Sequence, residues 1–160
     1  MITGKFISDY FEGLSRNHPG VAHSDKECHY VNLNDDKKQT FMADTLRYPA
    51  VMFETSGYIV RATGDTLTKR HQCHLQVVTH VIDTGDYAEI EKALSDCDGI
   101  LTDFLAQMLI DKRNRLPRWM AGLKFEGIEV IPIETKSDAL YGVLAELYFP
   151  EAICINTNRQ

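Results

Sequence analysis

The sequence has no long apolar run and no closely spaced cysteine pair. No stretch approaches the roughly 18 consecutive apolar residues that a transmembrane helix requires. The N-terminal residues lack the basic start, apolar run and small-residue cleavage site of a signal peptide. We therefore expect a soluble, non-secreted protein. Its four cysteines form no CxxC pair, which argues against a zinc module and a dense disulfide framework. We expect reduced thiols at Cys28, Cys73, Cys97 and Cys154.

The motifs that identify many enzymes are also missing. The turn at Thr63-Gly64-Asp65 has neither the second glycine nor the lysine of a phosphate-binding loop. A nucleophilic cysteine needs a lowered pKa, which usually comes from a basic neighbour or a helix N-terminus. Cys97 instead falls on the apolar face of a predicted helix and Cys73 in a predicted strand, where buried thiols are common. We predict no enzymatic activity and no cofactor.

Charge and length restrict the function further. The chain has 160 residues, 44% of them hydrophobic, which suffices for one core, so we predict a single domain over residues 1–160. It has 23 acidic and 17 basic residues, and a net charge of −6 does not favour a protein that coats nucleic acid. The nearest approach to a basic patch is Lys112-Arg113-Asn114-Arg115 with Arg118. There the cations follow a predicted helix and complement its dipole.

The first third of the chain predicts one helix and a long connection. Apolar residues recur at helical spacing as far as about Arg16, and His18-Pro19-Gly20 ends the pattern. From about residue 21 to 48 the pattern is lost among polar and turn-forming residues. We expect a long polar loop with short ordered pieces near Val31 and over residues 41–46, and long loops of this kind are often functional. We expect this loop to become ordered against a partner.

Three extended segments follow. Ala50–Glu54 predicts a buried strand that Ser56-Gly57 ends, and Tyr58–Ala62 predicts a second. The longest candidate covers about residues 69–82, where alternation assigns residues to two faces. The face that we expect to line the core carries His71, Cys73, Leu75, Val77, Thr79 and Val81. The other face carries Gln72, His74, Gln76, Val78, His80 and Ile82.

The second half predicts a long helix followed by two strands. Asp86 is the expected N-cap of a helix that extends to about Lys112, with Gly99 as its weakest position. Strands are predicted around residues 128–133 and over residues 139–149, with Pro132 at a sheet edge or a bulge. Strands interrupted by one helix indicate an α+β two-layer sandwich, in which the long helix packs on one face of a mostly antiparallel sheet and an N-terminal helix precedes it.

This order of elements resembles the tail-terminator and tail-completion (neck) proteins of long-tailed bacteriophages. Members of these families close with an aromatic-Gly-hydrophobic segment that leads into an alternating strand. The segment Tyr141-Gly142-Val143, within the closing stretch 138–149, matches that pattern. The polar loop over residues 21–48 is longer than the connections of the compact members, so a head-completion or other neck protein is an alternative within the same resemblance.

The resemblance implies a structural protein of a phage or prophage tail, commonly a hexameric ring. Such a protein caps the tail tube and connects it to the neck. Its partners are other copies of itself, tail tube proteins and neck proteins, with no membrane and no specific nucleic acid. It is located in the host-cell cytoplasm before assembly and in the virion tail afterwards.

Several polar and aromatic residues are candidates for the interface of such an assembly. A sheet face with alternating polar residues can lie toward solvent, a ring lumen or a neighbouring subunit. Trp119 either packs back on the core or anchors an interface, where Trp and Arg are common among hot spots. The candidates are Gln72, His74, Gln76, His80, Trp119, Arg118 and Tyr141.

A small cytoplasmic metal- or ligand-binding, enzyme-like domain is the alternative function. Its site would include His71, Cys73 and His74, with His80 six positions further on. In a strand, however, His71 and Cys73 lie on one face while His74 and His80 lie on the other. A third ligand such as Cys28 or His29 would have to come from the loop, so we favour ordinary core and surface roles.

Overall fold

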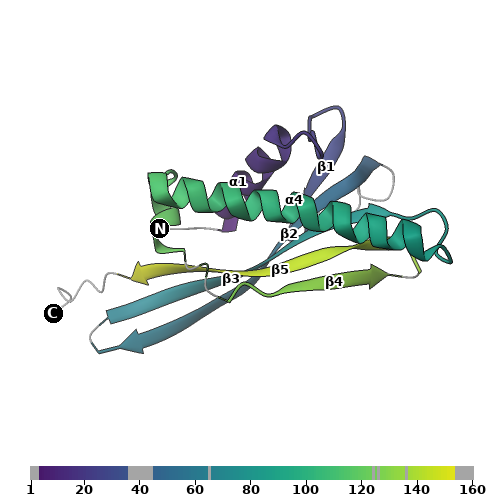
Figure 1. Ribbon diagram of the computed structural model, residues 1–160. Coiled ribbons are helices and arrows are strands. Elements are labelled where there is room, and N and C mark those ends of the chain that lie inside the picture. Colours follow the sequence, from purple (N-terminus) through teal and green to yellow (C-terminus); the bar gives the residue numbers. More distant parts are fainter. Residues whose placement is uncertain are drawn as a thin grey trace.

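A computed structural model describes residues 4–35, 45–64, 66–123, 125, 127–135 and 137–153. The long helix α4 lies across the sheet (Figure 1). In chain order the elements are α1 (Gly4–Asn17), β1 (Cys28–Asn32), β2 (Leu46–Thr63), β3 (Thr66–His80), α4 (Tyr87–Asn114), the 3-10 helix η1 (Arg118–Gly122), β4 (Val130–Thr135) and β5 (Leu140–Ile153).

The five strands form one sheet in the order β1-β2-β3-β5-β4. Only β1 and β2 are parallel, whereas the other three pairings are antiparallel. Both α1 and α4 contribute to the core on the same face of the sheet, because Phe11 of α1 and Phe104 of α4 belong to one buried cluster with Phe53 of β2. The predicted α+β two-layer sandwich is confirmed.

The ends of α4 follow from its local sequence. The side chain of Asp86 accepts hydrogen bonds from the backbone N–H groups of Ala88 and Glu89, which the helix itself leaves unpaired. At the other end, Arg115 adopts a left-handed conformation with φ 56°, and its N–H bonds to the last turn. Gly99 lies on the exposed side of the unbroken helix, so the prediction of one long helix is confirmed.

Burial along β3 follows the predicted alternation. His71, Cys73, Leu75 and Val77 are buried beneath the helices, which confirms most of the predicted core face. Just beyond the end of β3, Val81 packs with Ala93 and Tyr141 in a small cluster that is separate from the main core. A further cluster includes residues of the opposite face, namely Val31, Ala50, Met52 and Val78.

The prediction that Ser56-Gly57 ends a strand is wrong. β2 continues through these residues for 18 positions, and its register against β3 shifts between Thr55 and Gly57. Such a shift is a β-bulge, in which an extra residue bends the strand without ending the ladder. Gly57, at φ 131°, supplies the backbone conformation that L-residues rarely adopt.

Strand β1 and the first residues of β2 lie within the polar loop predicted over residues 21–48. Its ordered piece near Val31 is confirmed as β1, and β2 begins at Leu46 rather than at Ala50. The sequence did not predict the full lengths of β1 and β2, because the two strands pair in parallel with each other. Local periodicity does not reveal such a contact. Residues 41–44 of the second predicted piece lie outside the described residues.

At the sheet margins, one prediction from the sequence is confirmed and one is wrong. Pro132 lies in β4, which is an edge strand as predicted, since proline cannot donate to a ladder. β3 ends at His80, so Ile82, predicted on its second face, lies beyond the strand. The backbone of Val81 instead bonds to Ala139 beside the start of β5, with an N···O distance of 2.9 Å.

Candidate interaction surfaces

The sheet face opposite the helices carries the polar candidates of β3. Gln72, His74 and Gln76 are half-buried and His80 is exposed, each alternating with a residue of the core face as far as Val77. Their shared face is confirmed by the burial pattern, while a role in an interface stays a prediction. This face has side chains that can form directed polar contacts with another chain.

His74 lies at the centre of a row that crosses three strands. It pairs in register with Glu54 of β2 and with Glu146 of β5. Its Nδ1 lies 3.8 Å from a Glu54 carboxylate oxygen, and its Nε2 lies 4.0 Å from Glu146 Oε1. Cross-strand neighbours of this kind interact directly on a sheet face, so His74 is held between two carboxylates.

Glu146 accepts two further side-chain hydrogen bonds in this row. The Tyr148 hydroxyl donates a hydrogen bond of 2.6 Å to Oε1 of Glu146, and the Gln72 side chain donates to the same oxygen. The bond from Tyr148 is the largest cause that holds the pKa of Glu146 below its ordinary value. The guanidinium of Arg70 stacks over the Tyr148 ring at 3.8 Å. Glu146 and Tyr148 were not predicted as site residues, although the alternation of β5 places them on this face.

The row also contains a serine, but its geometry does not favour nucleophilic catalysis. Ser56 Oγ lies 3.1 Å from Nδ1 of His74. A serine nucleophile needs a histidine that a third group orients by a hydrogen bond. The 4.0 Å between Nε2 and Glu146 is too long for such a bond, and Ser56 is exposed in the bulge. The row is better suited to contacts with another polar surface.

A β-hairpin projects beyond the helices, and we call its outer part the arm (residues 57–63 of β2 and 66–70 of β3; Figure 1). Three consecutive apolar residues of the arm are exposed: Tyr58 at 59%, Ile59 at 42% and Val60 at 50%. Successive residues of a strand point to opposite faces, so apolar side chains are exposed on both faces of the arm. The sequence predicted these strands but not their exposure.

The backbone pairing along the outer edge of β2 changes at Thr55. Up to Phe53 this edge pairs with β1. The side chain of Asn34 then accepts a hydrogen bond of 2.7 Å from the Thr55 N–H and donates one of 3.1 Å to its carbonyl. Beyond Thr55, no strand in the described part of the chain pairs with this edge. Free strand edges are templates for pairing with another chain.

The remaining interface candidates have different surroundings. Trp119 is half-buried and packs edge-to-face against Tyr10 and Phe149, with ring centroids 5.5 Å apart in both pairs, so it packs back on the core. Arg118, beside it, is exposed. Tyr141 is 1% exposed because it lies on the helix-facing side of β5 beneath α4. It therefore offers no contact surface to another chain, in contrast to the prediction.

The residues of the alternative metal site do not converge. His71 and Cys73 are buried on the core face, whereas His74 lies on the opposite face, and Nδ1 of His29 bonds to the carbonyl of Pro49 at 2.9 Å. Burial raises the pKa of the Cys73 thiol to about 12, which disfavours the thiolate. Across the described ranges, no three His, Cys, Asp or Glu side chains are grouped so that they could hold a metal ion.

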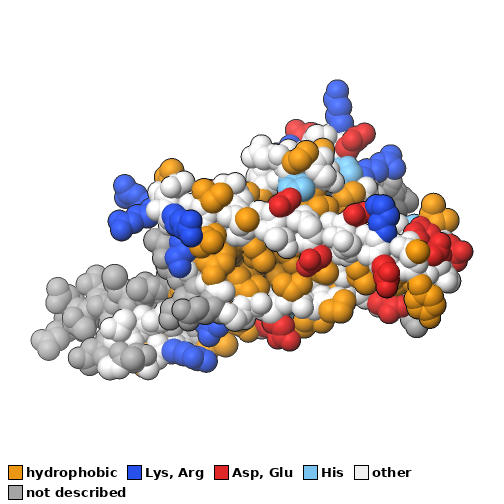
Figure 2. Space-filling model, viewed as in Figure 1, with side chains coloured by type: hydrophobic (Ala, Val, Ile, Leu, Met, Phe, Trp, Pro, Cys, Tyr) orange, Lys and Arg blue, Asp and Glu red, His pale blue; other side chains and the backbone are white. Residues whose placement is uncertain are grey.

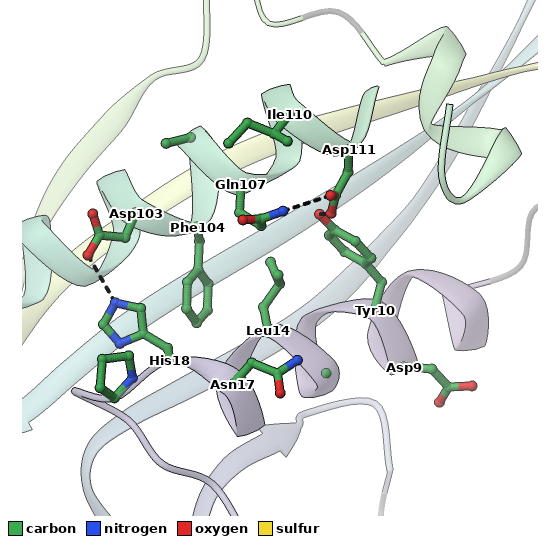
Figure 3. A pocket seen from close by; sticks show the side chains of 13 residues that line it. Asp9, Tyr10, Leu14, Asn17, His18, Asp103, Phe104, Gln107, Ile110 and Asp111 are labelled. Atoms are coloured by element: carbon green, nitrogen blue, oxygen red, sulfur yellow. Dashed lines mark hydrogen bonds and ion pairs between the residues drawn. The ribbon is translucent and has the colours of Figure 1, made fainter. Parts of the chain in front are cut away.

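A groove of about 790 Å³ lies between α1 and α4 (Figure 3). Its apolar lining includes Leu14 and Phe104, and its polar lining includes Asp103 and Asp111. The Tyr10 hydroxyl donates a 2.7 Å hydrogen bond to Asp111. Burial, followed by this contact, raises the pKa of Tyr10 above its ordinary value. The groove was not predicted from the sequence.

The imidazole of His18 is fixed at one end of this groove. Its Nδ1 accepts a 3.0 Å hydrogen bond from the Gly20 N–H, so the ring proton belongs on Nε2. Nε2 then donates to Asp103 Oδ2 at 3.0 Å. His18 and Asp103 are 85 positions apart, and no sequence signal connects them. Asp103 is thus hydrogen-bonded to an imidazole rather than to a lysine or an arginine.

No protein-family model matches this chain, and no curated protein sequence is significantly similar to it. Among the helices of the described residues, none has the length together with the apolar character needed to cross a bilayer. The surfaces described above, together with the order of elements, therefore carry the functional argument.

Proposed function

We propose that this chain is a structural assembly protein of a phage or prophage tail, which caps the tail tube and connects it to the neck. Support comes from the order of its elements, which resembles that of tail-terminator proteins, and from the closing segment Tyr141-Gly142-Val143 in β5. In this proposal the protein acts by binding other chains, and its location is the host-cell cytoplasm before assembly and the virion tail afterwards.

The single observation that carries this proposal is the arm. Its residues Tyr58, Ile59 and Val60 expose apolar side chains on both faces, and the β2 edge beyond Thr55 has no strand partner in the described chain. An exposed apolar hairpin with a free edge gains stability when another chain covers it, since apolar area leaves water and backbone groups become paired. We therefore assign the arm to contacts between subunits.

A ring is the assembly that these surfaces favour. The arm belongs to the β2 and β3 side of the sheet, whereas β4 forms the opposite edge and exposes Val130 and Ile131. Contacts between two different surfaces of the same chain are head-to-tail, and they produce a ring when the rotation closes. The proposed assembly is a homo-oligomer, with a hexameric ring as its expected form.

The polar row on the open face has a second role in this proposal. Gln72, His74 and Glu146 form a connected polar surface rather than an apolar one. Such a surface tolerates water and binds partners through hydrogen bonds at moderate affinity. We assign it to contact with the tail tube, with a neck protein or with the ring lumen.

Light scattering after size-exclusion chromatography tests the proposal, with the purified chain measured over a wide series of concentrations. The expected species is a closed oligomer, and six chains of 18.2 kDa give about 109 kDa. Its mass should fall toward that of the monomer only on dilution. A constant mass of one chain at every concentration would argue against self-assembly and would contradict the proposal.

A further inference from the structure

The groove between α1 and α4 is lined by both acidic and apolar side chains. Its thirteen lining residues include Asp9, Asp103 and Asp111 but no lysine or arginine. Asp9 is paired with Lys5 at 2.6 Å. For the other two carboxylates, His18 bonds to Asp103, and the Tyr10 and Gln107 side chains bond to Asp111. In the part of the chain that the structure describes, neither carboxylate is therefore paired with a lysine or an arginine.

The apolar part of the groove fits a partner with both aliphatic and charged groups. Leu14, Phe104 and Ile110 line it, and Ile110 is exposed. In Figure 3 the Leu14 and Phe104 side chains lie between the Asp103–His18 contact and the Asp111–Tyr10 contact. Arginine combines an aliphatic stem that packs on apolar surface with a guanidinium that binds carboxylates bidentately. An arginine-rich segment with an apolar residue would match this lining.

The chain carries such a segment at the end of α4. We call Arg113, Arg115, Leu116 and Arg118 the basic end of α4. Its three arginines are exposed, and the described residues form no ion pair with any of them. Leu116 is 67% exposed where the chain leaves the helix. Figure 2 shows several blue side chains at this end of the molecule, and others lie over its upper part.

We propose that the groove binds the basic end of α4 from a second copy of the chain. The two surfaces are complementary in charge and in apolar character. Among the described residues, no lysine or arginine pairs with Asp103 or Asp111, and no carboxylate pairs with the arginines of the basic end. Because the groove and the basic end are different surfaces, their contact is head-to-tail and repeats from copy to copy. This inference rests on the proposed self-assembly and names one of its interfaces.

A charge-swap experiment tests this contact. One variant reverses the groove charge by Asp103→Arg, at a side chain that is 68% exposed. The other reverses the basic end by Arg113→Glu with Arg118→Glu and keeps Arg115, whose backbone caps the helix. Matched controls are Asp98→Arg, on the exposed surface of α4 outside the groove lining, and Lys26→Glu, in an exposed loop.

Each variant alone should raise the concentration needed for half-assembly by about tenfold or more, since like charges then face each other across the contact. An equimolar mixture should recover wild-type assembly, because each kind of contact again joins opposite charges. The two controls should assemble as the wild type does. Circular dichroism and thermal melting establish that each variant is folded.

Other outcomes separate this inference from the proposed function. Wild-type assembly that neither variant weakens would overturn the groove contact and leave the proposed function standing, as would a mixture that fails to recover. A wild type that remains monomeric would overturn both. If Asp103→Arg fails to fold, the milder Asp103→Asn and the salt dependence of wild-type assembly take its place. Assembly that added salt does not weaken would then overturn the contact.

Discussion

Gly142 of β5 lies so close to Val77 of β3 that a Cβ atom added at Gly142 would stand 2.0 Å from the Val77 carbonyl oxygen. Real Cβ atoms do not approach other atoms at that distance. The nearest atoms belong to the backbone of Val77 and Val78, which cannot move aside as a flexible side chain can. The glycine of the Tyr141-Gly142-Val143 segment therefore permits close approach of two central strands.

Substitution of this glycine should destabilise the fold. We expect Gly142→Ala to lower the free energy of unfolding by about 3 kcal/mol, because overpacking forces the β3 and β5 backbones apart. Gly99→Ala is the matched control, since nothing lies within 4 Å of a Cβ atom there. That control should stabilise α4 by about 0.5–1 kcal/mol. Urea denaturation measures both, and equal effects would contradict the steric argument.

The buried contact between Ser8 and Tyr30 joins α1 to β1. Ser8 Oγ lies 2.8 Å from the Tyr30 hydroxyl, which donates to the Ser8 carbonyl at 2.9 Å. We expect Tyr30→Phe to cost about 1–2 kcal/mol of unfolding free energy, because it leaves the buried Ser8 hydroxyl without this partner. Ser8→Ala in the same chain should recover part of the loss. A double variant less stable than Tyr30→Phe alone would contradict this account.

Two buried thiols should make the fold sensitive to alkaline pH. Burial raises the pKa of Cys73 and of Cys97 from 9.0 to about 12. Above pH 9 the unfolded chain releases thiol protons that the folded chain retains. The contribution of the two thiols to the free energy of unfolding is therefore fully present below pH 9 and falls as pH rises toward 12. The slope should approach about 1.4 kcal/mol per pH unit for each thiol.

Denaturation at a series of pH values measures this slope in the wild type and in Cys97→Ala. The variant should lose stability more slowly above pH 9, since one of the two buried thiols is gone. Identical slopes for the two proteins would show that Cys97 does not contribute. Alkylation mapped by mass spectrometry provides a second reading, in which Cys73 and Cys97 stay unmodified until the chain unfolds.

The arm should matter for assembly and little for folding. We expect Ile59→Lys to change the free energy of unfolding by less than about 0.5 kcal/mol, because the side chain is exposed in the single chain. It should weaken self-association about tenfold or more, because a charge replaces apolar surface at the proposed interface. Ile82→Lys is the control, at a position 89% exposed outside the strands. Light scattering that shows equal masses for both variants would count against the arm.

Trp119 allows the core packing of η1 to be tested. Its ring contacts Tyr10 of α1 and Phe149 of β5, so it connects three elements. We expect Trp119→Ala to cost about 3 kcal/mol, and Trp119→Phe to cost less because it keeps part of the aromatic contact. Thermal melting provides the comparison. A neutral Trp119→Ala variant would favour a role at an interface instead.

Local patterns in the sequence predict much of this fold. Alternation in β3 assigns Cys73 and Leu75 to the core, and the cap at Asp86 marks the start of α4. What the sequence does not reveal depends on distant partners. The parallel pairing of β1, the bulge at Ser56 and the burial of Tyr141 follow from contacts between segments far apart in the chain. The same reason explains the missed groove, whose walls meet only after α1 and α4 dock on the sheet.

Electron microscopy of the assembled species tests the central claim most directly, because it distinguishes closure from mere association. The proposal predicts that the largest species of the wild-type chain is a closed ring with a central opening, and that Ile59→Lys lowers the fraction of particles in rings at a given concentration. Monomers or twofold dimers at every concentration, with no ring among the imaged particles, would contradict the account.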